Sequence, residues 1–112
     1  MVASKSDLFD ADLQRKANLF KALSHPARLQ ILQYLAQTRK CITGDISEHF
    51  PLTRGTVNQH MKELKNAGLV VGHMEGSKVV YCLNADRIRE LETLLGDFQK
   101  EIKLPADFSC CL

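Results

Sequence analysis

Apolar residues recur along the first third of this chain with the spacing of amphipathic helices. Residues 8–23 repeat apolar positions at three- and four-residue steps, and so does the segment that follows Pro26. Proline suits the first turn of a helix, and either Ser24 or His25 can cap it. The pattern therefore predicts two consecutive helices, of which the second is apolar on more than one side and should be well buried.

The next part of the chain predicts a short helix, a tight turn and a longer helix. The short helix is expected from Gly44 to Phe50, and the longer one begins after the N-cap Thr53 and ends before Gly68. The apolar positions of the longer helix, which can be buried together, are Val57, Met61 and Leu64. Its opposite face carries Arg54, Thr56, Asn58, Gln59, His60 and Lys62. Such side chains pair with bases and phosphates, although an ordinary surface helix has the same apolar spacing.

Alternating residues after this helix predict a hairpin, and a final helix follows it. The pattern predicts two strands, Leu69–Met74 and Lys78–Leu83, joined at Glu75-Gly76-Ser77. Earlier in the chain, the segment Cys41-Ile42-Thr43 is long enough only for a strand fragment. Ala85 to about Lys103 should form the last helix. Two short helices followed by a hairpin indicate a winged helix-turn-helix, mainly α with a small β-wing, in the order α-α-β-α-α-β-β-α. Such a fold offers one helix to the major groove and a loop to the neighbouring backbone.

Length and composition fit one small domain. The chain has 112 residues, of which 45% are hydrophobic and 25% charged. We expect a flexible N-terminus over residues 1–7, one DNA-binding and dimerisation domain over 8–104, and a Cys-containing tail over 105–112. No apolar run is long enough to span a membrane, and the first residues lack the apolar region of a secretion signal. We therefore expect a cytoplasmic protein whose four cysteines are thiols or metal ligands, not structural disulfides.

Net charge alone does not decide the partner. The formal charge is only +2, but residues 1–40 hold seven Lys or Arg against three Asp or Glu. Residues 41–83 hold four of each, and residues 84–112 hold four against six. A weakly basic domain can still bind DNA when its cations lie on one face.

Two blocks of residues resemble the ArsR/SmtB family of bacterial winged-helix repressors. The first block runs from Ala22 to Leu29 and reads A-L-S-H-P-A-R-L. The second block joins the predicted recognition helix, from Thr56 to Leu64, to Ala67-Gly68-Leu69-Val70. The wing also matches, through Glu75-Gly76 and Val79 to Leu83, and the resemblance extends from residue 8 to about 102.

The resemblance implies a homodimeric repressor on an inverted-repeat operator, released when a metal, metalloid or other signal binds. Its dimer would join the first and last helices, where the wide apolar stripes include Leu13, Phe20, Leu91, Leu95, Phe98 and Ile102. The alternative is that each stripe packs only within its own subunit. A two-fold dimer also suits a two-fold operator.

The DNA contacts are expected from the recognition helix and the wing. The candidates are Thr53, Arg54, Gly55, Thr56, Asn58, Gln59, His60, Lys62, Lys65 and Lys78. Residues early in the helix should reach base edges, and the lysines suit phosphates. Gly55 would let the backbone approach DNA, unless it is simply a small residue without a role. His60 can instead pack within the protein, and an exposed hairpin lysine such as Lys78 is common without function.

The cysteines are the candidate sensor. No histidine lies in residues 84–112, so the Asp/His metal site that the family carries on its last helix has no counterpart. The family's arsenic sensors often have Cys-x-Cys where the third helix begins, and here only Cys41 is kept. If Ile42 and Tyr81 face the core, Cys41 and Cys82 both face outward and can be neighbours.

Cys110 and Cys111 form a second pair at the end of the chain. Soft thiolates favour soft metals and metalloids, so Cys110, Cys111 and Cys41 or Cys82 could bind As(III) or Sb(III), if need be across a dimer. The alternatives are a disordered tail without a ligand, or thiol oxidation and persulfide chemistry as the trigger.

Other function classes are less well supported. The sequence has no glycine-rich phosphate loop, paired acid and base, or nucleophile triad, so we do not expect an enzyme. A winged-helix module that binds protein is the more serious rival, and it would show no salt-sensitive DNA binding. No membrane partner is expected.

Overall fold

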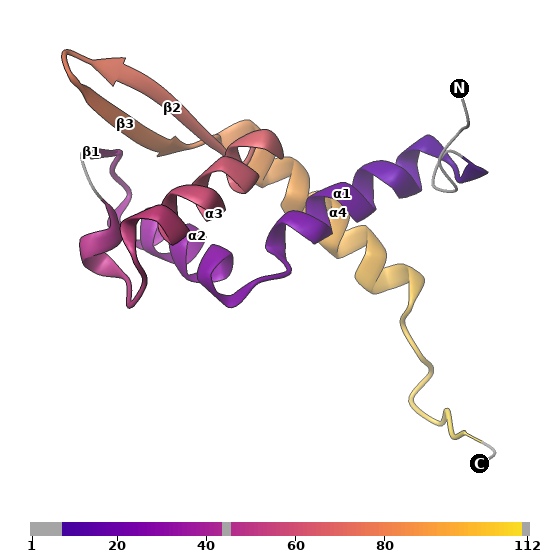
Figure 1. Ribbon diagram of the computed structural model, residues 1–112. Coiled ribbons are helices and arrows are strands. Elements are labelled where there is room, and N and C mark those ends of the chain that lie inside the picture. Colours follow the sequence, from indigo (N-terminus) through magenta and orange to yellow (C-terminus); the bar gives the residue numbers. More distant parts are fainter. Residues whose placement is uncertain (1–7, 44–45, 111–112) are drawn as a thin grey trace.

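The computed structural model describes residues 8–43 and 46–110 and has the predicted order of elements (Figure 1). Its helices are α1 (Ala11–Leu23), α2 (Pro26–Thr38), α3 (Arg54–Asn66) and α4 (Ala85–Glu101), with a 3-10 turn, η2 (Ile46–His49). Its strands are β1 (Ile42–Thr43), β2 (Val70–Glu75) and β3 (Lys78–Leu83). The predicted N-terminal segment 1–7 and the last two residues of the predicted tail lie outside the described residues.

Four predicted elements were wrong at their boundaries by a few residues. The first wing strand runs over Val70–Glu75, one residue later at each end than the predicted Leu69–Met74. The first helix begins at Ala11 and not at residue 8, because the Asp10 carbonyl accepts its first backbone hydrogen bond. The short third helix is a 3-10 turn over Ile46–His49, and residues 44–45 of the prediction are not described. The last helix ends at Glu101, two residues earlier than expected.

Local side chains and backbone hydrogen bonds fix the start of α2 and both ends of α3. The N–H of Ala27 donates to Nδ1 of His25 at 3.0 Å, which makes His25 the cap of α2. Thr53 caps α3, as predicted, by accepting from the N–H of Thr56. At the other end of α3, Gly68 has a φ of +80° and donates to the Lys65 carbonyl. The N–H of Leu69 donates to the Leu64 carbonyl, which completes a Schellman ending.

The three strands form one antiparallel sheet in the order β1-β3-β2. Ile42 pairs with Tyr81, and Val70 pairs with Leu83. Gly76 has a φ of +64° at the first of the two turn residues, where type II′ hairpins require glycine. The short strand therefore pairs with the second strand of the hairpin.

The core lies where α3 crosses the other helices and the base of the sheet. The predicted stripe of α3 is almost completely covered, with exposed fractions of 0% for Val57, 1% for Met61 and 0% for Leu64. Burying each of these side chains stabilises the fold by about 1.5–3 kcal/mol. The other buried members of the same cluster are Leu19, Ala22, Ile31, Leu35, Ile46, Phe50, Leu69, Val70, Leu91 and Leu94.

Helices α1 and α4 cross at the end of the molecule opposite the wing (Figure 1). Lys16 Nζ donates to Glu101 Oε1 at 3.1 Å, and Arg15 pairs with Glu90. The rings of Phe20 and Phe98 lie with their centroids 5.6 Å apart. These contacts set one face of α1 against α4, so other apolar side chains of the pair remain exposed. No helix in the described part of the chain has the length and apolar character to cross a bilayer.

Candidate nucleic-acid interface

The outer face of α3 is polar and open to solvent. Because Val57, Met61 and Leu64 occupy the inner face, the predicted DNA-contact residues between them point outward. The exposed candidates on this helix are Arg54, Gly55, Thr56, Asn58, Gln59, Lys62 and Lys65. The side chain of Gln59 donates to Glu63 at 3.5 Å. We call this surface, together with the capping residue Thr53, the recognition face.

The N-terminal end of the recognition face is preorganised. The hydroxyls of Thr53 and Thr56 lie 2.9 Å apart, and the same Thr53 oxygen caps the helix. Gly55 lies between them in the first turn. Apart from its chain neighbours and the backbone of its own helix, no atom of the described protein lies within 4 Å of where its Cβ would be. Nothing in the protein therefore requires glycine at this position. Close approach of another molecule to the backbone remains the interpretation that gives Gly55 a role.

His60 is half-buried and packs partly within the protein. Its ring lies 4.1 Å from that of His25, the cap of α2. Burial lowers the pKa of His60 below its ordinary 6.5, and repulsion from His25 and Arg28 lowers it further, while Glu63 acts in the opposite direction. The structure thus supports the packing interpretation of His60, because the ring lies against the cap of α2, whereas a DNA contact of His60 stays a prediction.

The wing adds one exposed cation. Lys78 begins β3 directly after the turn and is exposed. Its register partner, Glu75, lies 3.2 Å from Nε2 of His73, so an acid is present at the same tip. The wing therefore has less net positive charge than the recognition face, and Lys78 is its candidate for a phosphate contact.

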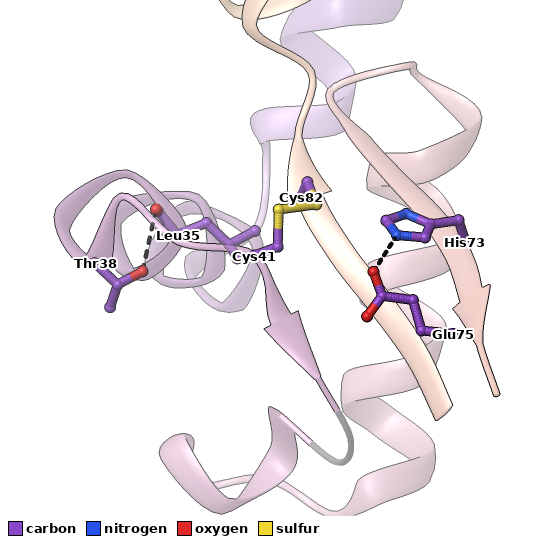
Figure 2. The surroundings of a disulfide bond; sticks show 6 residues. All are labelled: Leu35, Thr38, Cys41, His73, Glu75 and Cys82. Atoms are coloured by element: carbon purple, nitrogen blue, oxygen red, sulfur yellow. Dashed lines mark hydrogen bonds and ion pairs between the residues drawn. A yellow bond between two sulfur atoms is a disulfide. The ribbon is translucent and has the colours of Figure 1, made fainter. Parts of the chain in front are cut away.

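The structure overturns the expectation that all four cysteines are thiols. Cys41 and Cys82 form a disulfide, with their Cα atoms 4.4 Å apart (Figure 2). The alternation of side chains along a strand explains this disulfide. Ile42 and Tyr81 pack against the core, so the neighbouring cysteines project from the opposite face of the sheet. Neither sulfur can act as a metal ligand until this bond is reduced.

Cys110 does not join this pair within one chain. Cys110 is a free, exposed thiol, and Cys111 lies outside the described residues. Figure 1 shows the tail leaving α4 at the far side of the molecule from β1. Within residues 8–43 and 46–110, no group of three or more His, Cys, Asp or Glu side chains could hold a metal ion.

The sequence analysis missed three cations around the disulfide. Arg39, Lys40 and Arg89 line the same cleft as Cys41 and Cys82, between the end of α2, β3 and the start of α4. Two of these cations stand directly before Cys41 in the chain, which was the available signal. The third comes from a distant helix and could be placed only by the fold.

The predicted dimer residues divide into two groups. Leu91 is only 7% exposed and belongs to the core of a single chain, so it is not an available interface residue. Leu13 and Ile102 are exposed by 50% and 59%, and Leu95 and Phe98 by 45% and 39%. Phe20 is half-buried against Phe98. An uncovered apolar surface thus runs along α1 and α4.

Comparison with known proteins agrees with this architecture. The model of the family described as bacterial regulatory protein, arsR family, matches residues 25–71. The arsenical resistance operon repressor of Bacillus subtilis (strain 168) is 31% identical over 113 residues, covering 99% of this chain and 100% of that protein. This chain belongs to the arsR family.

Two further matches support membership of the arsR family. Transcriptional repressor SdpR of Bacillus subtilis (strain 168) is 34% identical over 73 residues, which cover 65% of this chain and 80% of SdpR. A crystal structure of a possible transcriptional regulator for arsenical resistance has a TM-score of 0.66 at 28% identity, covering 73% of this chain and 84% of that one. As an arsR-family member, the chain is a DNA-binding transcriptional regulator with a winged helix-turn-helix fold and is not an enzyme.

Replacing Gly55 should affect folding and DNA binding in opposite directions. Gly55→Ala should raise the free energy of unfolding by about 0.5–1 kcal/mol, since alanine restricts the unfolded chain and meets no neighbour in the helix. The same methyl group should weaken operator binding if the backbone approaches DNA here. Urea unfolding and operator titration of one preparation measure both effects. An alanine variant that binds the operator as tightly as the parent would remove Gly55 from the interface.

The His60–His25 contact predicts a pH-dependent stability. Because the pKa of His60 is lower in the folded chain than the ordinary 6.5, the unfolded chain binds more protons as the pH falls below that value. This contribution to the free energy of unfolding is fully present above pH 6.5 and is lost as the pH falls through the lowered pKa. His60→Gln should flatten the dependence measured by urea unfolding between about pH 7.5 and 5. Equal slopes for the parent and the variant would contradict the prediction.

Proposed function

We propose that this chain is a homodimeric transcriptional repressor that acts in the cytoplasm. In this proposal the two recognition faces enter successive major grooves of an inverted-repeat operator. The observation that carries the proposal is the division of α3 into a fully buried apolar side and an exposed side rich in donors for bases and phosphates. Two relatives are named as repressors, which supports repression and not activation as the effect of this chain on transcription.

Base readout is assigned to the first two turns of α3. Arg54 would pair with guanine and Asn58 or Gln59 with adenine, because these side chains match the paired donors and acceptors of those bases. Lys62, Lys65 and Lys78 would contact phosphates, and Thr53 would contribute by holding the end of α3 in place. His60 would contact DNA from the edge of the face.

Dimerisation is assigned to the uncovered apolar surface of α1 and α4. Leu13, Leu95, Phe98 and Ile102 are the exposed members of this surface, and Phe20 lies beneath Phe98. Covering such a surface with a second copy removes apolar area from water and supplies the two-fold axis that an inverted repeat requires.

The signal is assigned to the cysteines, in one of two forms. A trivalent arsenic or antimony ion takes soft thiolates, and reduction of the Cys41–Cys82 pair would supply two that are already adjacent. A third thiolate would come from Cys110 or Cys111 of a second chain. The disulfide itself favours the other form, in which thiol oxidation is the trigger. The relative named for arsenical resistance supports the first form.

Loss of a base contact should weaken operator binding selectively. Arg54→Ala and Gln59→Ala should each cost about 1–3 kcal/mol of binding free energy, and binding by the parent should weaken steeply as salt rises. Lys103→Ala removes an exposed cation just beyond the C-terminal end of α4 and should leave affinity unchanged. Titration of a labelled operator at several salt concentrations measures these effects. Parent-like affinity in both α3 variants, or binding that salt does not affect, would favour a protein-binding module.

An acidic residue on the proposed dimer surface should yield monomers. Leu95→Glu places a charge where the second copy would bury it, so the sedimentation coefficient should fall to that of a single chain. Leu29→Glu is the matched control, because Leu29 is also 45% exposed but lies on α2. If the parent sediments as a monomer, or if Leu95→Glu remains a dimer, this surface is not the interface.

Thiol-reactive agents should release the operator from the reduced protein. Arsenite or cadmium should dissociate the complex, and Cys82→Ser should require much more of either agent because one of two adjacent thiolates is missing. Cys110→Ser and Cys111→Ser test the tail separately, and peroxide tests oxidation. Release that is the same in all cysteine variants would reject the sensor assignment while leaving the repressor intact.

A further inference from the structure

The disulfide lies in the wall of a positively charged cleft. The cleft has a volume of about 570 Å³ and is bounded by the end of α2, by β3 and by the first turns of α4. Arg39, Lys40 and Arg89 contribute its charge, and none of the described residues that line it is acidic. The nearest acid in contact with these cations is Asp86, 3.6 Å from Arg89, and both side chains are largely exposed. Aliphatic side chains form the rest of the lining.

The two cysteines differ in exposure. Cys41 stands before β1 and is an exposed residue, whereas Cys82 lies within β3 and is half-buried. Figure 2 shows the bond between them. We therefore place the attack of a nucleophile at the more exposed residue, Cys41. The thiolate that leaves is then Cys82, and the surrounding cations would stabilise it.

We propose that this cleft is a reaction site for small anionic thiols, which exchange with the Cys41–Cys82 disulfide. A thiolate attacks Sγ of Cys41, forms a mixed disulfide and releases the thiolate of Cys82. A second small thiolate attacks the sulfur of the first and releases the thiolate of Cys41. Two small thiolates thus become one small disulfide, and the protein disulfide accepts two electrons. The reverse reaction with the small disulfide restores the bond.

A carboxylate on the small thiol is what the cleft selects. Clefts lined by one sign of charge raise the local concentration of oppositely charged molecules, and aliphatic walls exclude some of the water that would screen them. A carboxylate beside the reacting thiol can bind Lys40 or Arg89 while the sulfur reaches Cys41. Neutral and cationic thiols gain no such contact.

The exchange would act on the whole DNA-reading unit. The disulfide spans 41 residues, and the covalent loop that it closes contains β1, η2, α3 and both wing strands. Exchange breaks the covalent link that closes this loop. The two-residue pairing of β1 with β3 then joins the ends of the loop. This regulatory consequence rests on the proposed function, whereas the exchange chemistry does not.

Reduction rates of the full-length oxidised chain test the site. The probes are the anionic thiol 3-mercaptopropionate, the neutral thiol 2-mercaptoethanol and the cationic thiol cysteamine. The rate at which each thiol reduces the protein is divided by its rate with the uncharged bis(2-hydroxyethyl) disulfide, which corrects for the reactivity of the thiol itself. Alkylation followed by mass spectrometry measures the protein thiols formed. At low salt the normalised rate should be about threefold or more higher for the anionic thiol than for the cationic one. The difference should disappear in high salt. Equal normalised rates for the three thiols would overturn the proposal.

Charge reversal in the cleft gives the matched comparison. Lys40→Glu and Arg89→Glu should abolish the preference for the anionic thiol, and Lys103→Glu, which makes the same change outside the cleft, should preserve it. A preference that survives in both cleft variants would also overturn the site. Operator titration is a separate measurement: its failure removes the repressor function, while loss of charge selectivity removes the exchange site.

Discussion

Burial of one stripe of α3 is the constraint on which the rest of this molecule depends. Val57, Met61 and Leu64 are covered on all sides, and together they fix the rotation of the helix about its own axis. Once that rotation is fixed, the polar side chains between them have only the outward direction available. The Thr53 cap and the Gly68 ending limit the helix to these turns, so the recognition face has defined ends as well as a defined orientation.

A second constraint acts on the position of this helix relative to the wing. The β1–β3 pairing and the Cys41–Cys82 disulfide join the strand that precedes the helix-turn-helix to the strand that follows it. The recognition face and the wing therefore belong to one closed unit, while α1 and α4 lie outside it and carry the uncovered apolar surface. The proposed function therefore assigns the reading of DNA and the pairing with a second copy to different parts of a chain of only 112 residues.

Much of this arrangement could be predicted from the sequence because it depends on short-range periodicity. Spacing and local chemistry predict the α3 stripe, the Thr53 cap, the Gly68 ending and the inward direction of Ile42 and Tyr81. The disulfide was wrongly excluded because an argument from cell compartment was given more weight than the strand parity that brought the cysteines together. Burial of Leu91 and the approach of Arg89 to Lys40 could not be predicted, since both depend on how α4 crosses the rest of the chain.

The most direct test of the account is the reactivity of its lysines with and without operator DNA. Acetylation followed by mass spectrometry reports each lysine separately, and all of those concerned are exposed in the free protein. Lys62, Lys65 and Lys78 should become protected when the operator binds, while Lys100 and Lys103 on α4 and beyond it should react as before. Protection that is confined to the α4 lysines, or that is equal at all five, would contradict the assignment of α3 and the wing to DNA.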